Sequence, residues 1–147
     1  MSDEINGSLV PTSRADAMLL LEAGYLWMDL GKFDKARDIF VGAAQLMPKS
    51  EVPQLALGTL EFAQGHHEKA LQSYRVAQKL APRSGLPRAH AGEVLLFMGK
   101  ATEALKELKA AKDVEPSGDG AKLAAALIEA HESGALSPQN KVAAKKK

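Results

Sequence analysis

The sequence predicts an all-α protein in which one helix pair is repeated three times. Two observations carry this prediction. Alanine, leucine, lysine and glutamate are abundant, and these residues favour helix. Selected residue types also recur every 34 positions through most of the chain, and a period of that length is typical of helical solenoids. Few stretches alternate with β-branched residues, so strands are not expected.

Six columns define the period. Two contain glycine, two alanine and one proline, and the sixth holds a large apolar or aromatic side chain. The columns are Gly24, Gly58 and Gly92; Gly31, Gly65 and Gly99; Ala36, Ala70 and Ala104; Phe40, Tyr74 and Leu108; Ala43, Ala77 and Ala111; and Pro48, Pro82 and Pro116. Six columns over three periods cannot plausibly arise by chance.

Each column has a physical role in the expected pair. Glycine inside a helix costs about 1 kcal/mol relative to alanine, so Gly24 is expected where a neighbouring helix packs on bare backbone. Ala36 and Ala43 keep the second helix close, and Phe40 fills the space beside them. The later glycine column ends the first helix, and the proline column ends the second.

The expected helices cover residues 14–30, 34–47, 51–64, 68–81, 85–98 and 102–114. Ser13 followed by Asp16 predicts a capping box at the first start. Residues 119–132 predict one further helix, a first helix without its second, which would cover the apolar face of the last repeat. The domain is expected to span residues 13–132, between disordered ends at 1–12 and 133–147.

The period and its small, aromatic and proline columns resemble the tetratricopeptide-repeat (TPR) family. The resemblance covers residues 17–118 as repeats 17–50, 51–84 and 85–118. Where the family places an aromatic in the middle of the first helix, this chain has Trp27, Glu61 and Leu95. We therefore expect the second repeat to pack more loosely against its neighbour.

The resemblance implies a concave groove lined by the first helices at repeat positions two, five, nine, twelve and thirteen. Most side chains at these positions are apolar. The predicted groove residues are Met18, Leu21, Tyr25, Met28, Val52, Leu55, Thr59, Phe62, Leu86, Ala89, Glu93, Leu96 and Phe97.

Residues 17–29 are apolar almost all round, whereas a core-facing helix has one apolar stripe. Exposed apolar patches usually mark interaction sites. The favoured interpretation is a groove that receives an amphipathic helix or an extended apolar segment of a partner protein. A second copy of the chain and the chain's own ends are the alternative occupants.

TPR domains that bind the acidic C-termini of heat-shock chaperones use a clamp of lysine and asparagine. The matching positions here are Leu21, Tyr25, Ala56, Leu86 and His90. Carboxylate capture needs charged or amide donors, so this use is not expected.

A second resemblance is to the short three-repeat chaperones of bacterial type III secretion systems. It rests on Leu-Glu-Ala-Gly-Tyr-Leu (21–26), Glu-Val-Pro-Gln-Leu-Ala-Leu-Gly (51–58) and Ala-Gly-Glu-Val-Leu-Leu-Phe-Met-Gly (91–99). It implies a cytoplasmic chaperone that holds a needle or translocator subunit, as a homodimer or in a heterocomplex with a co-chaperone. A general TPR adaptor or scaffold subunit is the alternative.

Other function classes find little support. Four lysines lie in residues 135–147, which leaves 15 bases against 18 acids elsewhere, whereas a nucleic-acid binder carries a basic face on its body. The acidic start at residues 1–4 differs from a signal peptide. The apolar stretch 17–21 is far shorter than the roughly 20 residues that cross a bilayer, so no membrane span is expected.

No catalytic, cofactor or metal site is predicted. The chain has no cysteine, no Gly-x-Ser-x-Gly elbow and no phosphate-binding loop. His66 and His67 lie in an expected turn without a cluster that would complete a metal site, and we expect both to be solvated. His90 either lines the groove, where it would make binding pH-sensitive, or is an ordinary partly exposed polar residue.

Overall fold

The computed structural model describes residues 14–136, and every regular element in that range is an α-helix. Each helix begins and ends within one residue of its predicted bounds, so the predicted all-α repeat fold is confirmed. Ser13, residues 1–12 and residues 137–147 lie outside the described residues. The helices are α2 (Arg14–Asp29), α3 (Phe33–Leu46), α4 (Val52–Ala63), α5 (His67–Leu80), α6 (Leu86–Phe97), α7 (Ala101–Val114) and α8 (Asp119–Glu132).

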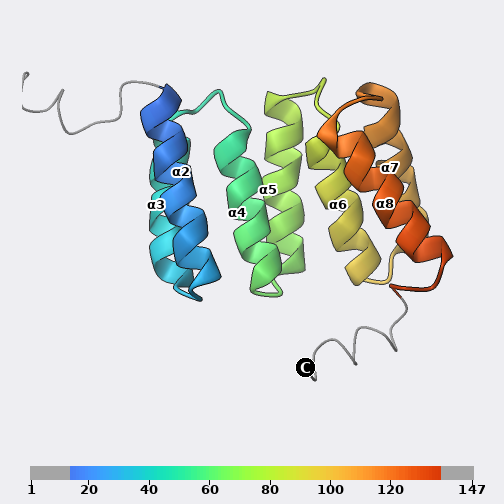
Figure 1. The fold of residues 1–147 in the computed structure, drawn as a ribbon. Helices are drawn as coiled ribbons and strands as arrows, with labels where there is room; N and C mark the ends of the chain where they lie inside the picture. Colours follow the sequence, from blue (N-terminus) through green and yellow to red (C-terminus); the bar gives the residue numbers. More distant parts are fainter. Residues whose placement is uncertain (1–13, 137–147) are drawn as a thin grey trace, which may run out of the picture.

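The helices pack as consecutive pairs, α2 with α3, α4 with α5 and α6 with α7 (Figure 1). Each second helix also contacts the first helix of the next pair, and α8 contacts both α6 and α7. Each repeat therefore contacts only its neighbours, which is the arrangement of a solenoid. Helix α8 takes the place of a fourth first helix and covers the last repeat, as predicted.

The first glycine column lets a large side chain lie directly on the backbone of the first helix. A Cβ atom at any of the three glycines would overlap that side chain. Phe40, Tyr74 and Leu108 are fully buried as a result, and full burial of such a side chain contributes roughly 1.5–3 kcal/mol. The closest approaches to a Cβ would be 2.3 Å for Gly24 and Phe40, 2.4 Å for Gly58 and Tyr74, and 2.6 Å for Gly92 and Leu108.

The second glycine column ends the first helices in a left-handed turn. Gly31, Gly65 and Gly99 have φ angles of +72°, +78° and +78°, a region that glycine enters without steric cost. In the first repeat the Lys32 N–H donates to the Trp27 carbonyl at 2.8 Å, which is the long hydrogen bond of a Schellman motif. The second helix then begins two residues after each glycine.

The core consists of three apolar clusters, and each joins one repeat to the next. The first is centred on Phe40 and reaches Leu60 of the second repeat. The next is centred on Tyr74 and reaches Val94 of the third repeat. The last surrounds Leu108 and includes Ala124 of α8. The alanines of both alanine columns are fully buried in these clusters, which explains why the columns stay small.

Position eleven of the second repeat holds a buried polar network, and the looser packing expected for this repeat stays a prediction. The Glu61 carboxylate is only 5% exposed. Arg37 of α3 donates to one of its oxygens, and His66 Nδ1 lies 2.8 Å from the other. Arg37 also donates to the Gln64 side chain at 2.9 Å. His66 is exposed, as expected, and it also links the turn to this carboxylate.

The network changes the acidity of Glu61. Burial alone would raise its pKa, because the charged form is poorly solvated there. Hydrogen bonds from Arg37 and His66, together with their charges, outweigh burial and hold the pKa of Glu61 below its usual value. The same hydrogen bond raises the pKa of Arg37. Glu61 is therefore an ionised buried group that depends on two partners.

The joint between the second and third repeats uses charges differently. Glu107 of α7 forms an ion pair with Arg75 of α5 at 2.8 Å and accepts a hydrogen bond from Arg88 of α6 at 3.2 Å. Leu95 occupies position eleven and is buried in the last apolar cluster. At this joint the ion pairs of Glu107 cross between α5, α6 and α7, and position eleven is apolar.

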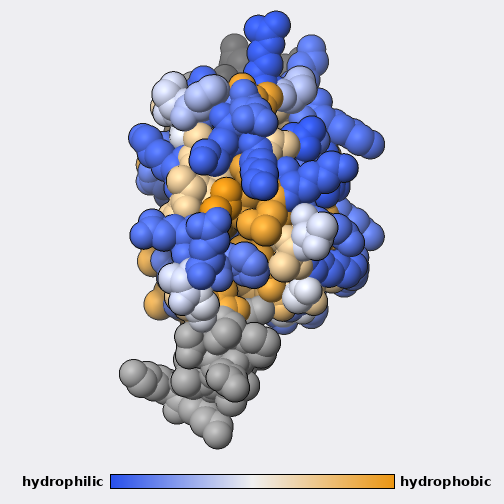
Figure 2. Space-filling model, turned by 90° about the vertical axis from the view of Figure 1, so that its right-hand side faces the viewer, coloured by the Kyte–Doolittle hydropathy of each residue, from blue (hydrophilic) through white to orange (hydrophobic). Residues whose placement is uncertain are grey.

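Helix α8 sits on the start of α6 through a close backbone contact. A Cβ at Gly120 would lie 2.2 Å from the carbonyl carbon of Gly85, and the Gly85 N–H donates to the Glu115 side chain at 3.0 Å. Leu136, inside the range expected to be a disordered tail, packs against the last cluster. Figure 2 faces this end of the molecule and shows a small apolar area ringed by hydrophilic residues.

Candidate partner-binding surface

Four of the predicted groove residues are buried inside the protein. Leu21, Leu55, Ala89 and Leu96 are each at most 9% exposed and belong to the apolar clusters. They support the surface from beneath and present little area to a partner, which corrects their expected role. The other nine are exposed or half-buried, namely Met18, Tyr25, Met28, Val52, Thr59, Phe62, Leu86, Glu93 and Phe97.

One edge of this surface contains a pocket of about 370 Å³ at the joint of α2, α3 and α4. Its apolar lining comes from Met18, Val52 and Met47, and its charged lining includes Arg14 and Lys49. Thioethers adapt their shape to irregular apolar groups, so the pocket can accept an apolar side chain. Met47 was missed by sequence reasoning because it follows a second helix, outside the groove positions.

The centre of the surface is polar. The Thr59 hydroxyl donates to the Leu55 carbonyl at 3.0 Å and lies 3.3 Å from the Tyr74 hydroxyl. The His90 ring stacks on Tyr74 with 5.2 Å between ring centroids, and His90 Nδ1 lies 3.2 Å from a Glu93 oxygen. His90 thus lies beside a predicted groove residue, and its effect on the pH dependence of binding stays a prediction.

Two tyrosine hydroxyls in this region stay neutral at physiological pH. Burial raises the pKa of Tyr74 to about 12, and the nearby Glu93 charge acts in the same direction against the Thr59 hydrogen bond. Burial also raises the pKa of Tyr25, whose ring meets Phe40 edge-on at 5.1 Å. Tyr74 is fully buried, whereas Tyr25 is half-buried. Of these two hydroxyls, that of Tyr25 can therefore donate or accept a hydrogen bond to the backbone of a bound segment.

The opposite edge of the surface carries aromatic side chains. Phe62 of α4 and Phe97 of α6 meet edge-on with 5.0 Å between ring centroids, and Phe97 remains 39% exposed. His67 packs against Phe62 at 5.7 Å, so it is half-buried where solvation had been expected. This contact joins two first helices and leaves an apolar face in solvent.

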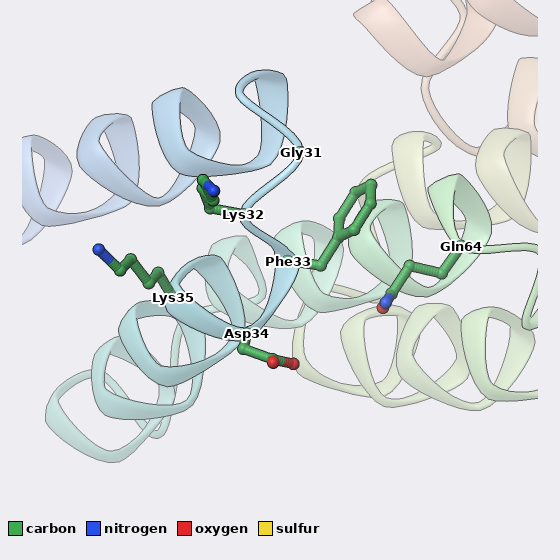
Figure 3. Close-up of a pocket in the computed structure, with 6 residues that line it drawn as sticks. All are labelled: Gly31, Lys32, Phe33, Asp34, Lys35 and Gln64. Atoms are coloured by element: carbon green, nitrogen blue, oxygen red, sulfur yellow. The ribbon is translucent and has the colours of Figure 1, made fainter.

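A second hollow lies outside the predicted groove. It is an open depression of about 400 Å³ beside the turn between α2 and α3. Figure 3 shows Phe33 at the start of α3 beside Gln64, which follows α4, while Lys32 and Lys35 point away from both on the other side of the turn. Phe33 is its one large apolar side chain, so the pocket at Met18 is better suited to an apolar segment. Its lining residues are Gly31, Lys32, Phe33, Asp34, Lys35 and Gln64.

Residues 14–136 contain no group of three or more histidine, aspartate or glutamate side chains placed to hold a metal ion. In the same range no helix is long and apolar enough to cross a membrane. What the described surface offers is a half-buried apolar strip with a polar centre, an arrangement suited to binding a polypeptide segment.

Comparison with known proteins shows which solved structures share this fold. No protein-family model and no curated protein matches the sequence. Among solved structures, the type III secretion translocator chaperone SycD of Yersinia enterocolitica aligns with a TM-score of 0.70 and 21% identity, over 80% of this chain and 91% of SycD. The fold matches that of TPR-like chaperones.

Two further structures show how widely this TPR fold is used. PcrH from Pseudomonas aeruginosa aligns with a TM-score of 0.68 and 26% identity, over 87% of this chain and 93% of PcrH. The first TPR domain of Spaghetti (RPAP3), bound to an HSP90 peptide, aligns with a TM-score of 0.61 and 21% identity, over 76% of this chain and 93% of that domain. The translocator chaperones among these structures are not enzymes, and the function of this chain must be argued from its own surface.

Proposed function

We propose that the chain is a non-enzymatic, cytoplasmic chaperone that holds an apolar segment of a secreted type III secretion subunit on its first-helix surface. The observation that carries this proposal is the pair of apolar edges, the Met18 pocket and the Phe62–Phe97 contact, on either side of a polar centre. Such a surface fits a segment whose apolar side chains occupy both edges while its backbone meets the hydroxyls between them.

The similar structures support this assignment. PcrH has been seen in complex with the chaperone-binding region of PopB, and SycD in complex with a peptide of the translocator YopD. A client held in this way keeps its apolar segment away from water and from other copies of itself. Binding only to the folded chaperone would also stabilise it.

The proposal is tested by recovering the client and then removing the apolar edges. The tagged full-length chain is isolated from its native cells, and co-purifying proteins are identified by mass spectrometry. We expect one or two small secreted subunits in near-equal amounts. The variants Phe97→Glu and Met18→Glu should reduce their recovery at least ten-fold, because each places a charge against an apolar client side chain.

Val76→Glu is the matched control, because Val76 is 44% exposed but lies on the second helix α5. It should recover the client like the wild type, and all three variants should keep the helix content measured by circular dichroism. Recovery of the client at wild-type level by both edge variants would rule out the proposed surface.

A general TPR adaptor is the second candidate, and the RPAP3 match favours it because that domain binds an HSP90 peptide. The clamp positions of this chain hold no lysine, arginine or asparagine, and Leu21 and Ala56 among them are buried, so the clamp that captures an acidic C-terminus is not reproduced here. Recovery of large folded complexes without a small subunit would favour an adaptor. Size-exclusion chromatography with light scattering separates a homodimer, as in the alternative SycD dimer, from a heterocomplex with a co-chaperone.

A further inference from the structure

The most exposed large apolar side chains of the described residues belong to helix α2 and to Leu30, the residue that follows it. Leu19, Leu26 and Leu30 are 63%, 60% and 60% exposed. Spacings of seven and eleven residues place them within about 40° of one another around the helix axis, so they form one stripe about 16 Å long. We call these three residues the α2 stripe. It is separate from the predicted groove residues.

The repeat register shows what kind of surface the α2 stripe is. Leu19 and Leu26 occupy repeat positions three and ten. In the second repeat these positions are Pro53 and Leu60, and in the third they are Pro87 and Val94, and all four side chains are fully buried. These positions therefore belong to the joint with a preceding repeat. Among the described residues nothing precedes α2, so its stripe has the shape of a helix-packing surface without a helix on it.

Charges beside the α2 stripe determine which partner it suits. Helical spacing places Glu22 and Asp29 together on one flank, and both side chains are exposed. Arg14 lies away from the stripe, in the lining of the Met18 pocket. Helical spacing places Trp27 on the other flank of the stripe, and Lys35 lies over its ring. The flank formed by Glu22 and Asp29 is therefore the negative one.

We propose that the α2 stripe binds an amphipathic helix of a second protein, one with an apolar stripe and with lysine or arginine on the flank that faces Glu22 and Asp29. Apolar contact would cover the leucines, and basic side chains would meet Glu22 and Asp29. A second copy of this chain fits less well, because two antiparallel α2 helices would place this acidic flank against itself. The proposal stands independently of the client-binding surface, since it uses none of that surface's residues.

Two synthetic 18-residue helical peptides serve as probes. Both carry the same leucine stripe, and its flanks are lysine in one peptide and glutamate in the other. Fluorescence anisotropy with the full-length chain should show at least ten-fold tighter binding of the lysine peptide. The double variant Leu19→Ser/Leu26→Ser should lose at least ten-fold in affinity, and Glu22→Lys/Asp29→Lys should reverse the preference between the peptides.

Two control variants test whether the lysine peptide binds at the α2 stripe and not elsewhere on the protein. Val76→Ser removes an exposed apolar side chain from α5, and Phe97→Ser weakens the client-binding surface, so neither should change binding of the lysine peptide. The proposal is overturned if Phe97→Ser abolishes peptide binding while the α2 variants retain it. It is also overturned if the wild-type chain is a dimer that ignores the peptide and Leu19→Ser/Leu26→Ser makes it monomeric. Binding that appears only after residues 1–12 are deleted would overturn it too, because the chain's own start would then be the occupant.

Discussion

The joint between the first two repeats and the joint between the last two share one backbone design and differ in side-chain chemistry. At the first joint Glu61 is buried at position eleven and depends on Arg37 and His66. At the second joint Leu95 fills the same position, and the charges of the Glu107 network lie around it.

This difference shows that some repeat positions determine backbone spacing, while position eleven can vary in side-chain chemistry. The glycine and alanine columns determine how closely the backbones approach, and both joints keep them. Position eleven tolerates either an apolar side chain or a carboxylate, provided that each buried polar atom has a partner. Within the part of the chain that the structure describes, no buried side-chain nitrogen or oxygen lacks one.

The largest effect should come from a shared column. Gly58→Ala would place its Cβ 2.4 Å from the Tyr74 ring, and we expect the free energy of unfolding to fall by roughly 2–3 kcal/mol from overpacking. Urea denaturation followed by circular dichroism measures it. The control is Gly42→Ala within α3, where a Cβ meets nothing within 4 Å, and it should stabilise by up to about 1 kcal/mol. Equal effects at both sites would contradict the assigned role of the glycine column.

Removing an arginine should destabilise the protein more at the first joint than at the second. Arg37→Ala leaves the Glu61 charge buried with His66 as its remaining partner, and we expect a loss of about 2 kcal/mol. Arg75→Ala leaves Glu107 with Arg88, and we expect less than about 1 kcal/mol. The two variants are compared by denaturation in the same buffer. Similar losses would mean that the joints do not differ in their dependence on charge.

The first joint should also respond to acid. The pKa of Glu61 is lower in the folded chain than in the unfolded chain, so its ionised form stabilises the fold above its ordinary pKa, and this contribution disappears as the pH falls through the lowered value. At pH 7 Glu61→Gln should be less stable than the wild type by about 1 kcal/mol. The gap should close toward pH 3 in denaturation curves. A gap that stays constant across this range would contradict the assigned ionisation of Glu61.

The smallest effect should come from making the joints alike. Glu61→Leu removes the buried charge and restores the residue type of the third repeat. Arg37 and His66 are 36% and 46% exposed and can turn to water, so stability should change by less than about 1 kcal/mol. The mutant's melting temperature, compared with that of Arg37→Ala, checks this. If Glu61→Leu loses as much stability as Arg37→Ala, the network contributes net stability and does more than satisfy the hydrogen bonds of a buried carboxylate.

The fold was predictable because its columns are constraints on the backbone. Gly24 must be glycine because a side chain packs on its backbone, and Gly31 because its φ angle is positive. Both constraints recur every 34 residues, so the helix bounds can be predicted to within one residue. The Glu61 network was not predictable, because Arg37 lies 24 residues away and the two meet only once the repeats stack. The pattern identified Glu61 as unusual but did not identify its partner.

The candidate site was predicted less completely than the fold. The family's groove positions describe where the surface lies in a typical member. Position five also faces the interior. In this chain Leu21, Leu55 and Ala89 occupy that position and are small or apolar enough to be buried there. Met47 and His67 lie outside the family positions and join the surface only through tertiary packing. The assignment of Phe62 and Phe97 to a client remains a prediction.

The contact between Gly120 and Gly85 has a consequence for the order in which the protein opens. A linear array loses its least anchored end first. Helix α8 lies on α6 with backbone against backbone at Gly120 and Gly85, whereas within residues 14–136 no helix packs on the outer side of α2. Amide protons of α2 should therefore exchange with deuterium before those of α6, and the solenoid should unravel from its first repeat toward its last. Occupation of the α2 stripe would slow that opening at its starting point.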